Sequence, residues 1–182
     1  MDEVLRKKLK KVKMVVLDAD GVLTDGKVTF DDTGREWCSF DVKDGFGVRA
    51  LIHSGVIVAV ISGRMSEVVK NRAAMLGIKE IYIGVKEKRH PYRELLKRYG
   101  LKKEEVAYVA DDVYDLPLMK EVGISIAVAD SVEDVLREAD YVTRSCGGRG
   151  AVREVAEAVL KEKGLWDGIV AILFDEKRRD NL

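Results

Sequence analysis

The chain has 182 residues, a length that suits one domain with a single sizeable core. Hydrophobic residues make up 47% of it and charged residues 35%, and 32 Lys and Arg balance 32 Asp and Glu. This composition argues against a disordered chain and against a protein that coats nucleic acid. We therefore expect one folded domain over residues 1–182 and no nucleic-acid partner.

The ends of the chain and its cysteines carry few signals. No run of about 18 apolar residues occurs, and the basic start lacks the apolar core of a targeting peptide, so we expect no membrane contact and a cytoplasmic location. The basic residues at 6–11 are expected to be a solvated lead-in. Cys38 and Cys146 are far apart and have no histidine cluster beside them, so neither a zinc site nor a disulfide framework is predicted.

Short apolar runs alternate with segments of helical length. In chain order the expected elements are a strand at 14–20, a hairpin at about 26–45, a helix at 47–55, a strand at 56–62, a helix at 67–77, a strand at 80–84, a helix at 91–100, a strand at 106–111, a helix at 115–123, a strand at 124–129, a helix at 131–139, a strand at 140–143, and a helix and tail over about 150–182. The strands are nearly continuously apolar, as strands covered on both faces must be.

This alternation requires right-handed crossovers and predicts an α/β fold, a doubly wound, mainly parallel sheet of the Rossmann-like kind. The hairpin interrupts the alternation directly after the first strand, with "DDTG" as its tight turn. In the tail, residues 150–164 have the pattern of an amphipathic helix, and the last stretch is either docked or frayed.

Chemically reactive side chains follow four of the expected strands. They are Asp18 and Asp20 after the first strand, Ser62, Gly63 and Arg64 after the second, Lys86, Glu87 and Lys88 after the third, and Asp111, Asp112 and Asp115 after the fourth. Ligands of open parallel sheets bind beyond the carboxyl ends of the strands, so these residues are expected to meet at one edge. Clustered carboxylates repel one another unless a cation neutralises them, and Mg²⁺ suits such oxygen ligands. A nucleophilic aspartate, an amine and a hydroxyl beside Mg²⁺ point to phosphoryl transfer.

The segments "DADGVLTDG", "SGR", the lysine of "KEKRHPYRELL" and "ADDVYDLP" resemble, in order and spacing, the four motifs of the haloacid dehalogenase superfamily of phosphatases. The further segments "FDVKDGFGVR" and "GGRGAVREV" are similar to the branch of this superfamily that acts on 3-deoxy-D-manno-octulosonate 8-phosphate. The likeness covers residues from about 13 to about 160. Ala110 departs from the pattern, because relatives usually have glycine there.

The resemblance implies a role for each motif residue. Asp18 would be the nucleophile that forms an aspartyl-phosphate, and Asp20 would be the general acid and base. Mg²⁺ would be held by the Asp18 carboxylate, the main-chain carbonyl of Asp20 and Asp111, with Asp112 and Asp115 supporting it. Ser62, the Gly63 backbone and Lys88 would bind the phosphoryl oxygens. For Asp112 and Asp115, capping of the following helix is an alternative role.

The resemblance also implies how the substrate is held. Only about 40 residues separate Asp18 from Ser62, which leaves no room for the cap domain that many members have. In capless relatives the hairpin joins neighbouring subunits in a homotetramer, in which Lys43 and Asp44 would lie near a neighbour's pocket and the "GGRG" loop over the site. Arg64, Lys43 and Arg149 are the candidates for contact with the carboxylate of a small sugar-acid phosphate, although each could be an ordinary surface residue.

The implied function is Mg²⁺-dependent hydrolysis of 3-deoxy-D-manno-octulosonate 8-phosphate within lipopolysaccharide precursor synthesis. A phosphatase of a nine-carbon acid such as N-acylneuraminate 9-phosphate is an alternative, because the four motifs touch only the phosphoryl group. A phospho-accepting receiver-like signalling module would use a similar sheet, Mg²⁺ and clustered Asp, but it would lack the acid and base Asp20. A catalytically silent scaffold that works by binding is a third alternative.

Overall fold

A parallel sheet of six strands forms the centre of the protein, in the order β5-β4-β1-β6-β7-β8. The computed structural model describes residues 1–179, with side chains through Leu173. The strands are β1 (Met14–Leu17), β4 (Ile57–Ser62), β5 (Glu80–Ile83), β6 (Val106–Ala110), β7 (Ile124–Ala127) and β8 (Tyr141–Val142). Because β1 pairs with β4 on one side and β6 on the other, the order of the strands reverses at β1. Ligands of doubly wound sheets bind at this switch point.

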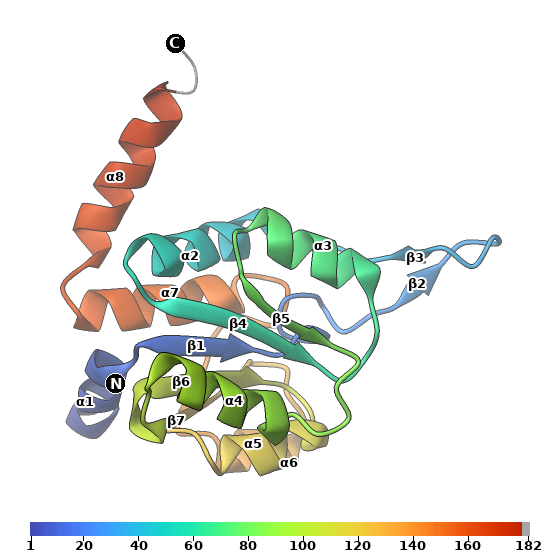
Figure 1. Ribbon diagram of the computed structural model, residues 1–182, viewed down its shortest axis with the longest axis horizontal. Helices are drawn as coiled ribbons and strands as arrows, with labels where there is room; N and C mark the ends of the chain where they lie inside the picture. The colour runs from blue at the N-terminus through green and yellow to red at the C-terminus, as the bar shows by residue number, and fades with distance from the viewer. Residues whose placement is uncertain (180–182) are drawn as a thin grey trace.

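Helices cover both faces of the sheet (Figure 1). One core cluster contains side chains from α1 (Glu3–Lys11), α2 (Val42–His53), α3 (Glu67–Met75) and α7 (Ala151–Glu162). The other contains side chains from α4 (Arg89–Tyr99), α5 (Leu116–Met119) and α6 (Glu133–Glu138). Strand β1 serves both clusters in alternation, with Val15 and Leu17 in the first and Met14 and Val16 in the second. The predicted doubly wound α/β fold is confirmed.

The first residues of the chain were predicted to be a solvated lead-in, and the structure shows a helix there instead. Residues 3–11 form α1, whose first turn is capped by the side chain of Asp2, which accepts a hydrogen bond from the Leu5 amide at 2.8 Å. Leu5 and Leu9, four residues apart on one face, are buried in the first core cluster, and the lysines face outward. Leu5 and Leu9 form a short apolar stripe that packs on the domain, and the basic residues around them made this stripe hard to recognise in the sequence.

The hairpin is shorter than predicted and projects from the body of the molecule (Figure 1). It consists of β2 (Thr29–Phe30) and β3 (Glu36–Trp37), which pair antiparallel. The side chain of Asp31 closes the turn by accepting hydrogen bonds from the Thr33 and Arg35 amides. Helix α2 begins at Val42 and not at the expected residue 47, because Asp41 caps it by accepting a hydrogen bond from the Lys43 amide at 2.6 Å.

Two short 3₁₀ turns, η1 (Lys103–Glu105) and η2 (Val113–Asp115), precede β6 and α5. The tail forms α8 (Trp166–Arg179), which leads away from the body in Figure 1. Its first residue, Trp166, packs edge-on against Phe46 of α2 with ring centroids 6.2 Å apart. Residues 180–182 of the expected tail lie outside the described residues. Within the described chain, no helix is long and apolar enough to cross a membrane.

Candidate active site

The carboxyl ends of β1, β4 and β6 and the loop after β5 surround a cavity of about 650 Å³. The backbone amide of Asp18 donates to the Val109 carbonyl at 3.0 Å, so the ladder between β1 and β6 continues into the site and fixes where that carboxylate points. Of the residues predicted from the sequence, the cavity is lined by Asp18, Asp20, Ser62, Gly63, Arg64, Lys88, Asp111, Asp112 and Asp115. The predicted meeting of four loop tips at one sheet edge is observed.

A buried ion network forms the floor of the cavity. The Lys88 ammonium donates to one oxygen of Asp18 and one of Asp115, each at 2.6 Å. Tyr108, on β6, donates its hydroxyl to the same Asp115 oxygen at 2.6 Å, and the other Asp115 oxygen accepts from the Asp111 amide at 3.2 Å. Asp115 is therefore saturated with donors. It holds Lys88 against Asp18 and orders the start of the loop that carries Asp111.

These groups shift one another's pKa. Burial raises the pKa of Asp18, which the charge of Lys88 only partly offsets. Burial, followed by the charges of Asp18 and Asp115, raises the pKa of Asp111. Burial lowers the pKa of Lys88, but the charges of Asp18 and Asp115 outweigh it, so the net pKa is raised and the amine stays charged. The site thus holds one ammonium among several carboxylates and has an excess of negative charge.

The same carboxylates fit a hard divalent cation. One oxygen each of Asp18, Asp111 and Asp115 lie within 4.8 Å of one another. The donors are all oxygen atoms, as Mg²⁺ prefers, and a cation would offset the negative charge of Asp18 and Asp111, whose pKa values are raised by burial and, to a lesser extent, by repulsion from neighbouring carboxylates. Gly21, at φ +80°, makes room for this cluster, since a Cβ there would lie 1.9 Å from a carboxylate oxygen of Asp111.

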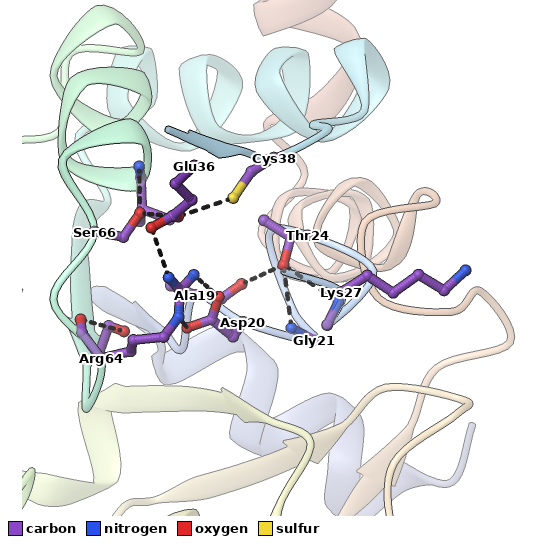
Figure 2. A network of polar contacts seen from close by, with 12 residues as sticks. Ala19, Asp20, Gly21, Thr24, Lys27, Glu36, Cys38, Arg64 and Ser66 are labelled. Atoms are coloured by element: carbon purple, nitrogen blue, oxygen red, sulfur yellow. Dashed lines mark hydrogen bonds and ion pairs between the residues drawn. The ribbon is translucent and has the colours of Figure 1, made fainter. Parts of the chain in front are cut away.

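Asp20 lines the cavity, and its partly exposed side chain belongs to a second network of polar contacts, which Figure 2 shows. Arg64 binds it side-on, with Nε at 2.9 Å from one carboxylate oxygen and an Nη group on the other. The remaining Nη group of Arg64 is 2.9 Å from Glu36 on the hairpin strand β3. The hydrogen bond to Asp20 raises the pKa of Arg64 above its usual value, so the guanidinium is charged.

The backbone around Asp20 is held by its own loop and by the "GGRG" segment. The Thr24 hydroxyl oxygen accepts from the Gly21 and Gly26 amides, each at 3.3 Å, which closes the turn after β1. The Gly148 amide donates to the Val22 carbonyl at 2.9 Å. A Cβ on Gly147 would lie 1.6 Å from the Gly21 carbonyl oxygen, so only glycine allows this close approach. The "GGRG" segment therefore packs directly on the loop that carries Asp20.

Two predicted substrate contacts lie elsewhere in the single chain. Lys43, in the first turn of α2, and Arg149 line a separate cavity of about 420 Å³ together with Arg144. Arg149 lies 4.0 Å from Asp25. Asp44, expected near a neighbour's pocket, is buried and caps α7 by accepting from the Gly150 and Arg153 amides at 3.1 and 2.8 Å. Contact of Lys43 or Arg149 with a substrate stays a prediction that requires a second subunit.

Two residues of the site, Tyr108 and Glu36, were not among those predicted from the sequence. Tyr108 is in the apolar strand β6, and the sequence offered one signal for it: the alternation of side chains between the two faces of that strand. Its hydroxyl donates to Asp115. Glu36 is on a hairpin without a local motif. Lys86 was expected at this edge of the sheet and lines the cavity, although the sequence assigned it no role.

Comparisons with known proteins agree with this geometry. A model of haloacid dehalogenase-like hydrolases matches residues 78–154. The 3-deoxy-D-manno-octulosonate 8-phosphate phosphatase KdsC of Escherichia coli strain K12 is 43% identical over 160 residues, which are 88% of this chain and 85% of that protein.

Solved structures agree as closely. The 3-deoxy-D-manno-octulosonate 8-phosphate phosphatase of Yersinia pestis has a TM-score of 0.91 at 40% identity, covering 92% of this chain and 91% of that one. The corresponding phosphatase of Moraxella catarrhalis, in complex with magnesium ion, phosphate ion and KDO, has a TM-score of 0.91 at 38% identity, covering 95% and 99%. The chain described here belongs to the KdsC family of 3-deoxy-D-manno-octulosonate 8-phosphate phosphatases, within the haloacid dehalogenase-like hydrolases.

Proposed function

We propose that this protein is a Mg²⁺-dependent phosphatase that hydrolyses 3-deoxy-D-manno-octulosonate 8-phosphate to the free sugar acid and phosphate, a step in the supply of lipopolysaccharide precursors. The observation that carries the proposal is the meeting of Asp18, Lys88 and Asp111 in one cavity, with Asp20 at its rim, in a chain of the KdsC family. The Moraxella catarrhalis relative supports the substrate class, because its crystals hold magnesium, phosphate and KDO together.

Asp18 is the nucleophile. Its carboxylate attacks phosphorus while the bond to the sugar oxygen breaks, and Asp20 donates a proton to that leaving oxygen. Asp20 then takes a proton from the water that attacks the aspartyl-phosphate, and Asp18 is released with inorganic phosphate. Asp20 suits this role because it lies at the cavity rim, two residues from Asp18, outside the buried ion network.

The remaining groups prepare the nucleophile and hold the phosphoryl group. Lys88 neutralises part of the charge of Asp18, so that an anionic phosphate can approach. Ser62 and the Gly63 backbone line the cavity at the end of β4, where they can donate to phosphoryl oxygens. Asp18, Asp111 and the main-chain carbonyl of Asp20 would hold Mg²⁺, with Asp115 and Asp112 supporting the loop. When bound, the metal ion neutralises the charge on the phosphoryl oxygens.

The substrate's carboxylate needs a cation that is not already paired. Three cationic side chains line the cavity: Lys88 is shared between Asp18 and Asp115, and Arg64 between Asp20 and Glu36. Lys86 makes no ion pair among the described residues, and its side chain is exposed at the cavity. Lys86 is therefore the cation in this chain that is ready to meet the sugar acid, with Arg64 joining it if it leaves its present partners.

The hairpin supports a homotetramer in which neighbours cover each other's sites. Phe30 is 61% exposed and Trp37 is 57% exposed, although both are large apolar side chains. They lie on a hairpin that projects away from the sheet (Figure 1). Burial of these side chains against other copies would stabilise the assembly. In such an assembly, Lys43 or Arg149 of one subunit would reach the cavity of another.

Phosphate release from a panel of sugar phosphates tests the activity. The panel contains 3-deoxy-D-manno-octulosonate 8-phosphate, N-acylneuraminate 9-phosphate and a neutral hexose phosphate, each with Mg²⁺ and with chelator. We expect the highest kcat/KM for the eight-carbon acid and loss of release in chelator. A higher kcat/KM for N-acylneuraminate 9-phosphate would mean that the nine-carbon acid is the substrate. A stable phosphoprotein without release of phosphate would indicate a signalling module.

A further inference from the structure

Glu36 is a hairpin residue that contacts the catalytic loops without lining the cavity. It lies on β3, and its side chain is 17% exposed. One carboxylate oxygen accepts from the Ser66 hydroxyl at 2.6 Å and from the Cys38 thiol at 3.2 Å. The other lies 2.9 Å from Arg64. Figure 2 shows the resulting chain of contacts from Glu36 through Arg64 to Asp20.

This arrangement fixes the orientation of Arg64. A guanidinium is a rigid planar fork, so a carboxylate on one Nη group determines where the opposite edge points. With Glu36 on one side, Nε and the other Nη group of Arg64 face both oxygens of Asp20. The hydrogen bond from Ser66 lowers the pKa of Glu36, partial burial opposes it, and Cys38 and Arg64 add to the lowering, so Glu36 is ionised at neutral pH.

We propose that Glu36 is a positioning residue for the acid and base Asp20 and acts through Arg64. The proposal rests on the role proposed above for Asp20. Without Glu36, Arg64 loses the partner that holds its plane, and the Asp20 carboxylate loses its fixed place beside the leaving oxygen. Because Glu36 is on the projecting hairpin, the position of the hairpin is thereby linked to proton transfer in the cavity.

A purely structural role for Glu36 makes a different prediction. Ser66, which donates to Glu36, also caps α3 by accepting from the Val69 amide at 3.3 Å. Glu36 could thus serve only to anchor the start of α3. In that case its loss would lower stability or affect all substrates alike, whereas a positioning role affects those substrates whose leaving group must be protonated.

The test compares Glu36→Gln with the wild type on two kinds of substrate. The sugar-acid phosphate has a strongly basic alkoxide leaving group that needs a proton, and p-nitrophenyl phosphate has a weakly basic phenolate that does not. The kcat/KM value reports the steps up to the first release of product. We expect Glu36→Gln to lower kcat/KM about 10-fold or more for the sugar-acid phosphate and less than about 2-fold for the aryl phosphate.

Taking the ratio of the two values on one preparation removes the effect of any unfolded fraction. Ser66→Ala, which removes the α3 cap but keeps the pair between Glu36 and Arg64, should leave this ratio near that of the wild type. So should Glu67→Gln, a change on the exposed face of the same turn. In an Arg64→Met background, Glu36→Gln should cause no further change, because its effect passes through Arg64.

Two outcomes would overturn the proposal. One is an unchanged ratio in Glu36→Gln, whether both kcat/KM values fall equally or neither falls, and the other is an added loss in the Arg64→Met background. Failure of the proposed function would look different. The wild type would then reject sugar-acid phosphates while still releasing phosphate from p-nitrophenyl phosphate. The role of Glu36 could still be measured with any alkyl phosphate that the wild type accepts.

Discussion

At the scale of single residues, the charge of Lys88 decides how the site can work. Its ammonium is shared between Asp18, which faces the cavity, and Asp115, which is buried behind it. Asp115 accepts from Lys88, from the Tyr108 hydroxyl and from two backbone amides, so movement of Lys88 would leave two buried carboxylates, Asp18 and Asp115, without their shared cation. This network keeps Asp18, the proposed nucleophile, in place before substrate or metal arrives.

Replacement of either proposed catalytic carboxylate, Asp18 or Asp20, should abolish most turnover. Asp18→Asn removes the attacking oxygen, and Asp20→Asn removes the proton donor. We expect each to lower kcat for the sugar-acid phosphate by at least about 10²-fold. Steady-state phosphate release measures this, with circular dichroism as the check on folding. Turnover near the wild-type value in either variant would reject the assigned role.

Lys86 should govern recognition of the carboxylate and leave the chemistry unaffected. Lys86→Met should raise KM for the sugar-acid phosphate about 10-fold, the effect of losing one charge-assisted contact of about 1.4 kcal/mol, and leave kcat nearly unchanged. KM for a neutral hexose phosphate should not change. Lys79→Met, an exposed change on another loop, is the control. An equal rise in KM for both substrates would place Lys86 on the phosphate instead.

At the scale of elements, the side chain of Glu80 on the edge strand β5 joins that strand to α4 through hydrogen bonds. Glu80 is buried at the start of β5 and receives the hydroxyls of Tyr82 and Tyr99 at 2.9 and 2.7 Å and the Arg98 guanidinium at 2.7 Å. Burial raises the pKa of Glu80, but these three donors outweigh it and hold the net pKa below its usual value. The helix that begins just after Lys88 is thereby tied to the sheet at its far end.

This lowered pKa predicts a specific pH dependence of stability. A carboxyl whose pKa is lower in the folded state stabilises the fold above its unfolded pKa of about 4.3 and loses that contribution as pH falls. We expect Glu80→Gln to lower the free energy of unfolding by about 1–3 kcal/mol at pH 7, and by less as the pH falls below about 4. Urea denaturation at several pH values measures this. The exposed Glu94→Gln should change little, and a deficit that grows toward low pH would contradict the assignment.

At the scale of the whole molecule, the projecting hairpin leaves apolar surface that the single chain does not cover. Trp37 and Phe30 extend from a hairpin whose two strands have two residues each, and a hairpin of that size is marginal without further packing. The cavity beside it is open in the single chain and is lined by Lys86, a cation that forms no ion pair with any residue that the structure describes. Both features are accounted for if neighbouring subunits pack on the hairpin.

Disruption of the hairpin surface should therefore change assembly. If the proposed tetramer forms, Trp37→Asp should convert it into smaller species in analytical ultracentrifugation, since the variant places a charge in the proposed interface. Met75→Asp, at a side chain of α3 that is also exposed, should leave the assembly unchanged. A wild type that sediments as a monomer, or a Trp37→Asp variant that remains tetrameric, would refute the role of the hairpin.

Much of the fold and part of the site could be read from local patterns. The alternation of apolar runs and helical segments indicated the doubly wound sheet, and the acids, hydroxyl and lysine after four strands indicated the cavity. The predicted ends of an element were wrong where a capping side chain, and not the apolar pattern, set the boundary. Helix α2, for example, is capped by Asp41 and begins five residues before its expected start. The prediction for the α1 segment was wrong because its two leucines, four residues apart, stand among lysines, and the basic residues dominated the pattern.

By itself, the sequence determined which chemistry gathers at the carboxyl ends of the strands, because strand period and strand order place those residues without reference to distant side chains. Only the tertiary structure decided which charges are already paired. Arg64 meets Asp20 across 44 positions of the chain and meets Glu36 from a separate hairpin, while Lys43 and Arg149 lie in another cavity. The physical reason is that ion pairs depend on the packing of distant elements to within an ångström, which no local periodicity encodes.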